Sequence, residues 1–175
     1  TSYLKDHSLN SNSIDADLSN TDLSGQNLSN KNFMDSKLIN SNLSNANLSN
    51  SILIGADLTG ADLTGADLTN VSLSTVDLTN TKLTGADLSN ANLFNVNLSG
   101  KDLTGTLLVG SDLTNTNLTG KDLTGKDLTG AKLRDMDLSG MDMKNTKLTG
   151  ADLTGADLTN VDISTADLTG AKLRD

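Results

Sequence analysis

Residues 56–60 read Ala-Asp-Leu-Thr-Gly, residues 61–65 repeat the same amino acids, and residues 66–70 read Ala-Asp-Leu-Thr-Asn. The rest of the chain varies this five-residue unit. If the central leucine is called position i, then leucine, or once each phenylalanine, methionine and isoleucine, recurs at every fifth residue from Leu18 to Leu173. Position i−2 is usually small, i−1 is mostly Asp or Asn, i+1 is mostly Ser or Thr, and i+2 is mostly Gly or Asn.

A spacing of five residues matches neither an amphipathic helix nor a strand, which need apolar periods of 3.6 and 2. Within one unit, the alternation over i−2, i−1 and i predicts a short extended piece with i−2 and i on the same side. Glycine or asparagine at i+2 tolerates a left-handed backbone and predicts a corner. A corner in every unit coils the chain, and the stacked coils bury the leucines, so the sequence predicts a solenoid.

These units resemble those of pentapeptide-repeat proteins, which read approximately Ala-Asp/Asn-Leu followed by two variable residues. The resemblance covers residues 16–175, which contain 32 consecutive units in frame. It implies an all-β fold, a right-handed quadrilateral β-helix in which four units form one coil. A coil then has 20 residues, and the chain has about eight coils.

Residues 1–15 are expected to form an irregular N-terminal cap or partial coil, and residues 16–175 the β-helix. Leu4, Leu9 and Ile14 keep the spacing of five among themselves, but Ile14 lies only four residues before Leu18. A cap would cover the apolar end of the solenoid. The last unit, 171–175, is an ordinary one, so we expect its coil either to continue in a longer protein or to stack on another copy, giving a homo-oligomer.

Composition excludes several classes of function. The formal net charge is −9, all 22 acidic residues are Asp, and there is no Cys for a disulfide, a thiol nucleophile or a Cys-based metal site. A chain of this charge would be repelled by nucleic acid, so direct binding is not expected. The longest aliphatic runs have three residues, too few for a membrane span, and no signal peptide is visible, which makes the cytoplasm the default localisation.

Because a coil has 20 residues, side chains 20 apart align in columns. One outward column at i−1 ends with four aspartates, the acidic ladder: Asp102, Asp122, Asp142 and Asp162. One interpretation is that Asp at i−1 keeps a repetitive β surface soluble. The family resemblance implies another, because some pentapeptide-repeat proteins mimic DNA and bind type II topoisomerases, protecting them from quinolones. A calcium site on the ladder would lack a wrapped loop and carbonyl ligands, so no metal is predicted.

A further i−1 column alternates in sign and predicts a ladder of surface ion pairs: Asp112, Lys132, Asp152 and Lys172.

An apolar group is the second outward feature. Met34, Ile54 and Phe94 share one column at i+1, and Ile52 lies on the same face at i−1. Exposed apolar side chains that cluster indicate a partner site, so we predict that this face contacts a protein.

Four lysines stand at i−2, where the pattern places a small inward residue: Lys31, Lys101, Lys121 and Lys126. Since a buried unpaired ammonium is costly, their long stems are expected to carry the charge to the surface, towards nearby aspartates. An anion site is the alternative.

No motif supports catalysis. The only histidine is His7, in the irregular segment, and no base is placed beside the many Ser and Thr hydroxyls. No cofactor is predicted. The sequence therefore predicts a non-enzymatic structural or protein-interaction rod with an unidentified protein partner, and as the alternative a DNA mimic that binds DNA gyrase.

Overall fold

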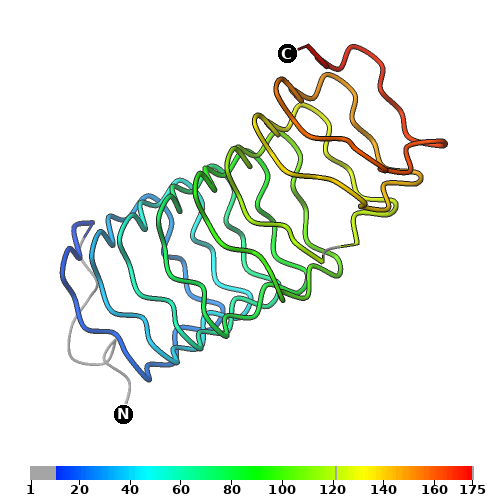
Figure 1. The fold of residues 1–175 in the computed structure, drawn as a ribbon. Coiled ribbons are helices and arrows are strands. Elements are labelled where there is room, and N and C mark those ends of the chain that lie inside the picture. The colour runs from blue at the N-terminus through cyan, green and yellow to red at the C-terminus, as the bar shows by residue number, and fades with distance from the viewer. Residues whose placement is uncertain (1–10, 121, 175) are drawn as a thin grey trace.

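Each five-residue unit forms one side of a four-sided coil, and successive coils stack into a rod (Figure 1). This computed structural model describes residues 11–120 and 122–174. These residues contain no helix and no continuous strand; their β structure consists of isolated parallel bridges between residues 20 apart, such as Asp57 with Asp77. The 20-residue step confirms the predicted quadrilateral β-helix. The four faces, called 1 to 4, begin with units 16–20, 21–25, 26–30 and 31–35 and recur every 20 residues.

Hydrogen bonds between coils use three N–H groups of a regular unit. The N–H of i−1 donates to the preceding coil, while those of i and i+2 donate to the following coil. In unit 56–60 these bonds join Asp57 to Ser36, Leu58 to Asp77 and Gly60 to Thr79, with N···O distances of 2.9, 3.2 and 2.8 Å. Each coil is therefore held to both neighbours by its backbone, as a strand is within a parallel sheet.

The corner of the unit is a β-turn. The N–H of Ala61 donates to the carbonyl oxygen of Leu58 at 2.9 Å, and Gly60 at the third turn position has φ +70°. Only glycine adopts that region freely, although asparagine tolerates it, as Asn70 does with φ 56°. This requirement explains why i+2 is mostly Gly or Asn.

The side chain at i−1 completes the turn. Asp57 Oδ1 accepts the N–H of Thr59 at 2.9 Å, so all five N–H groups of this unit have acceptors. The same bond recurs with Asn at i−1, as between Ser49 and Asn47. Asp at i−1 is therefore part of the turn, in addition to keeping the surface soluble as the sequence suggested.

The core is one column of inward side chains. From Leu18 to Leu153, every residue at i is at most 5% exposed. Small residues at i−2 complete the core, such as Ala46, Ala61 and Ala86, all with no exposed surface. Larger apolar side chains also occupy i−2, such as Val71 and Met136, which are 1% and 2% exposed. Because this position is buried, a hydroxyl there must find a partner nearby.

Serine at i−2 is satisfied in some units and not in others. Ser41 Oγ donates to the carbonyl oxygen of Leu38 at 2.7 Å. Ser36 Oγ and Ser51 Oγ are buried and have no hydrogen-bond partner in the described part of the chain. A buried hydroxyl without a partner costs free energy, because it lost its bonds to water on folding.

We therefore expect Ser36→Ala to raise the free energy of unfolding by about 1 kcal/mol, since alanine fits this position in many units and leaves no polar atom unpaired. Urea titration followed by circular dichroism measures the change. Ser41→Ala is the matched control and should not stabilise, because it removes a bond that is made. Equal effects of the two substitutions would contradict this explanation.

Regular coil begins earlier than the sequence predicted. Residues 11–15 form a complete unit in which Ser13 takes the inward position, is 8% exposed and accepts the N–H of Ala16 at 3.2 Å. Ile14 is 41% exposed at the outward i+1 position. Units 11–15 and 16–20 therefore follow one another without a slip, because a serine occupies position i of the first unit. The rest of the predicted cap, including His7, lies outside the described residues.

Face 4 holds the rod together along its whole described length. Its bridges run without a gap from Asn12 to Lys172. On the other faces the ladder is interrupted near the middle: in the described ranges, no bridge joins Asp77 to Asn97 or Lys82 to Asp102. The coils therefore separate on one side of the rod while staying bonded on the other.

Candidate functional site

The predicted apolar residues lie on face 4, where Ser74 separates Ile54 from Phe94 in the column. Successive coils place Ile14, Met34 and Ile54 one above the other, with backbone bonds of 3.0 Å from Asp15 to Met34 and from Asp35 to Ile54. We call the following residues the apolar stripe: Ile14, Met34, Ile52, Ile54 and Phe94. Phe94 is 40% exposed, and Met34, Ile52 and Ile54 are half-buried. The sequence-based prediction did not include Ile14, because residues 1–15 were assigned to an irregular cap. Ile14 lies 20 residues before Met34, so the column rule would have included it.

Ile52 replaces a residue that would support the turn. At i−1, an Asp or Asn would accept the N–H of Ile54, as Asn32 does for Met34 at 3.0 Å. An isoleucine cannot, so this unit forgoes a bond with a net value of about 1 kcal/mol. The stripe therefore departs from the pattern in a way that the fold does not require.

The acidic ladder lies on face 2, opposite the stripe. Asp142 and Asp162 form a bridge, and Asp102, Asp122 and Asp142 are exposed, whereas Asp162 is half-buried. One oxygen of each carboxylate is occupied by its own turn, with N···Oδ1 distances of 2.8 to 3.1 Å. The Ser164 hydroxyl and backbone bonds lower the pKa of Asp162, and the Thr124 bonds lower that of Asp122.

Cations reduce the charge of the ladder. Lys144 Nζ lies 3.7 Å from Asp142 Oδ2 and 3.3 Å from Asp162 Oδ2, and the two aspartates raise the pKa of this lysine. Lys126 is close enough to Asp102 and Asp122 to interact with both. The sequence could have shown Lys144, since it stands at i+1 in the same four coils, but only the i−1 column was read.

For an aspartate at i−1, the effect of the carboxylate charge on stability can be measured separately from the effect of its turn bond. In Asp67, Oδ1 accepts both the N–H of Thr69 at 3.0 Å and its hydroxyl at 2.7 Å. We expect Asp67→Ala to lower the free energy of unfolding by about 1 kcal/mol, because it removes both bonds. Asp67→Asn should change it by less than about 0.5 kcal/mol, because an amide oxygen serves as acceptor in other units. Denaturant titration of both variants tests this, and equal losses would show that charge, rather than the turn, matters.

The predicted ion-pair ladder forms only in part. Lys132 Nζ lies 3.3 Å from Asp112 Oδ2, as expected. Asp152 instead binds Arg134, whose Nη2 and Nε lie 2.5 and 2.7 Å from Asp152 Oδ2. The hydroxyl of Thr154 and this guanidinium lower the pKa of Asp152 to about 2. Arg134 stands at i+1 of the preceding coil, a column that the sequence argument did not include.

The inward lysines do not simply extend to the surface. Lys101 and Lys126 are half-buried, and their ammonium groups donate to backbone carbonyl oxygens of the preceding coil. Lys101 Nζ binds the oxygen of Leu78 and lies 3.2 Å from that of Thr81. Threonine at i−2 uses the same corner acceptor, as Thr81 Oγ1 does with Leu58 at 2.8 Å. Carbonyl oxygens at the corner therefore accept both ammonium groups, while Lys126 also interacts with Asp102 and Asp122, and Lys101 with Asp77.

Lys126 binds the preceding coil in the same way as Lys101. Lys126 Nζ binds the carbonyl oxygen of Leu103 and lies 3.3 Å from that of Thr106. Burial lowers the pKa of this ammonium, against the opposing effect of Asp102 and Asp122. Lys31 is half-buried, whereas Lys121 lies outside the described residues.

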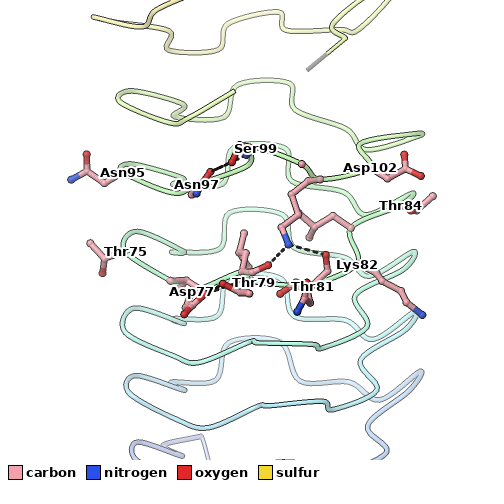
Figure 2. Close-up of a pocket in the computed structure, with 16 residues that line it drawn as sticks. Thr75, Asp77, Thr79, Thr81, Lys82, Thr84, Asn95, Asn97, Ser99 and Asp102 are labelled. Carbon is pink, nitrogen blue, oxygen red and sulfur yellow. Dashed lines mark hydrogen bonds between the residues drawn. The ribbon is translucent and has the colours of Figure 1, made fainter. Parts of the chain in front are cut away.

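A cleft of about 810 Å³ opens where Lys101 enters the junction between two coils. It follows faces 1 and 2, and Figure 2 shows its lower and upper lips on successive coils. The lower lip includes Asp77, Thr79, Thr81 and Lys82, and the upper lip includes Asn95, Asn97, Ser99 and Asp102. A smaller cleft of about 420 Å³ lies at the next junction, beside Lys126. We call the larger one the intercoil cleft.

The described residues contain no cluster of three potential metal-binding side chains. Nor do they include any helix with the length and apolar character needed to cross a membrane.

Comparison with known proteins identifies the repeat. The family model for pentapeptide repeats matches residues 16–53, 41–80, 72–110, 107–145 and 137–175. The chain belongs to the pentapeptide-repeat family. No curated protein matches it.

Solved structures of the family include similar chains. A protein of the Arabidopsis thaliana thylakoid lumen is 33% identical over 63% of this chain and 71% of its own, with a TM-score of 0.45. HetL from the cyanobacterium Nostoc sp. strain PCC 7120, involved in regulating heterocyst differentiation, is 33% identical over 94% and 85%, with a TM-score of 0.38. QnrB1, a plasmid-mediated fluoroquinolone resistance protein, is 20% identical over 92% of each chain, with a TM-score of 0.46.

Proposed function

We propose that this protein is a non-enzymatic rod that binds a protein partner through the apolar stripe on face 4. The observation that supports this most is the alignment of Ile14, Met34 and Ile54 in three successive coils, with Ile52 beside them. Apolar side chains gathered on one face favour association, because contact removes their surface from water.

The uninterrupted backbone ladder of face 4 strengthens the proposal. A binding surface needs groups held in fixed positions, and this face keeps every bridge from Asn12 to Lys172. The stripe would thus meet its partner as a preformed surface, with little ordering cost on binding.

Site-specific photo-crosslinking tests the position of the contact. A photoreactive amino acid replaces Ile54 on face 4 or, as control, Thr124 on face 2, and adducts formed in extracts of the source cells are identified. The proposal predicts one partner crosslinked from position 54 and absent from position 124. The same partner crosslinked from position 124 alone would contradict it.

DNA mimicry is the second candidate function, favoured by the net charge of −9 and by the exposed carboxylates of Asp102 and Asp122. Against it, Lys126 and Lys144 lie among the four aspartates. A DNA gyrase supercoiling assay with and without a quinolone tests this function. One result would be that the protein inhibits gyrase, or protects it from the quinolone, only while the four ladder residues are Asp and not Asn. That result would identify the acidic ladder, and not the apolar stripe, as the binding surface. Asn is the right substitution, because it removes charge and keeps the turn.

The possibility of a homo-oligomer through the last coil stays a prediction. Its inward side chains Leu158, Ile163 and Leu168 are half-buried, and Leu173 is 49% exposed. Sedimentation equilibrium of the purified chain would measure the association directly.

A further inference from the structure

The intercoil cleft is a break in the backbone ladder of face 1. At a regular junction of this face, three backbone bonds connect two coils. Between 76–80 and 96–100, none of the three is present in the described part of the chain. The missing bonds would join Leu78 N–H to Asn97 O, Asn80 N–H to Ser99 O, and Asn97 N–H to Val76 O.

Both lips of the cleft therefore present backbone donors and acceptors. The lower lip has the N–H groups of Leu78 and Asn80, and the carbonyl oxygen of Val76. The upper lip has the N–H of Asn97 and the carbonyl oxygens of Asn97 and Ser99. Such alternating groups are those of a strand edge whose ladder bonds are not made, which pairs readily with another extended chain.

The size of Lys101 explains why the coils separate here. Lys101 stands at i−2 on face 2. The same position carries Ser41 three coils earlier and Ala61 two coils earlier, and bridges connect the coils there. Lys101 instead places its stem and ammonium between the coils, against the carbonyl oxygens of Leu78 and Thr81. The side chain thus keeps the junction open at the corner between faces 1 and 2.

We propose that the intercoil cleft binds an extended peptide segment, which pairs with both lips on face 1. A free anion fits less well, because carbonyl oxygens and Asp77 line the cleft together with the N–H groups. A cation fits less well because Lys101 and Lys82 line it too. The volume of about 810 Å³ is within the range of ligand-binding clefts. This site is separate from the apolar stripe and does not depend on it.

Amide hydrogen exchange measured by NMR tests the premise and the binding. In the free protein, the amides of Leu78 and Asn80 should exchange faster than those of Leu58 and Gly60, which occupy the same positions and are bonded. The probe is an acetylated and amidated peptide with the sequence of residues 56–64, Ala-Asp-Leu-Thr-Gly-Ala-Asp-Leu-Thr. At about ten times its dissociation constant, the peptide should slow exchange at Leu78 and Asn80 roughly tenfold.

Three variants complete the test. Lys101→Ala should abolish this protection, because alanine lets the coils close as they do at Ala61, and Leu78 and Asn80 should then be protected without peptide. Lys126→Ala, at the neighbouring junction, should leave peptide binding unchanged, as should Ile54→Thr on the stripe. The proposal is overturned by slow exchange of Leu78 and Asn80 in the free protein. It is equally overturned if the peptide slows exchange only at amides of the last coil, or if millimolar peptide does not slow exchange at Leu78 and Asn80.

Discussion

Leu68→Ala is expected to lower the free energy of unfolding by about 3 kcal/mol. Leu68 has no exposed surface and stands at position i in the middle of the leucine column. Shortening it removes buried apolar atoms and leaves a cavity, and the backbone bonds between coils keep the surroundings from collapsing into it. Because each coil contacts only its neighbours, the loss interrupts the column on both sides.

Leu107→Ala is the matched control on the same face. Leu107 is 50% exposed at the outward i−1 position, so its truncation should cost less than about 0.5 kcal/mol. Guanidinium titration of both variants measures the two losses. If Leu107→Ala were as costly as Leu68→Ala, the assignment of inward and outward positions would be wrong.

Asp152→Asn is expected to cost about 1 kcal/mol of stability at neutral pH, because it removes the charge that pairs with Arg134 and keeps the acceptor for the turn. The hydroxyl of Thr154 and the guanidinium of Arg134 stabilise the ionised carboxylate, which lowers its pKa from 3.8 to about 2. That shift corresponds to roughly 2 kcal/mol of differential stabilisation. Asp152 is 7% exposed, but the Arg134 side chain is 51% exposed, so solvent screens part of the attraction, and Asn retains the bond to Thr154.

The direction of the pH dependence follows from the lowered pKa. The contribution of Asp152 is fully present above the unfolded pKa of 3.8 and is lost as the pH falls towards 2. The difference between the wild type and Asp152→Asn should therefore shrink across that range. Asp137→Asn is the control: Asp137 supports the same kind of turn, with 3.0 Å to the N–H of Ser139, but has no ion pair in the described part of the chain. A difference that stays constant from pH 7 to about 2 would exclude the charge-based explanation.

The fold could be predicted because one rule repeats. Leucine at every fifth residue and Gly or Asn at each corner leave few other ways to bury the apolar side chains. The unit centred on Ser13 was missed because an apolar residue was expected at position i. In the structure, the backbone bonds with Asn32 and Ala16 define that unit, and a serine is accepted at its centre.

The surface was less predictable, since columns must be read at every position and not only at i−1. Lys144 and Arg134 change the charge of the acidic and ion-pair columns, and both stand at i+1. The intercoil cleft was not foreseen at all. The inward lysines were recognised as anomalous, but whether Lys101 would reach solvent or a carbonyl oxygen depends on the distance to the neighbouring coil, which the sequence does not contain.

The affinity of the crosslinked partner, once purified, for two variants of the rod is the most direct test of the proposed function. The first variant combines Ile54→Thr and Phe94→Thr, using the commonest residue at i+1, and the second changes the four ladder aspartates to Asn. If the stripe is the contact surface, the first variant should bind at least roughly tenfold more weakly, a loss of about 1.4 kcal/mol, while the second binds as the wild type. Unchanged binding of the stripe variant together with lost binding of the ladder variant would contradict the proposal.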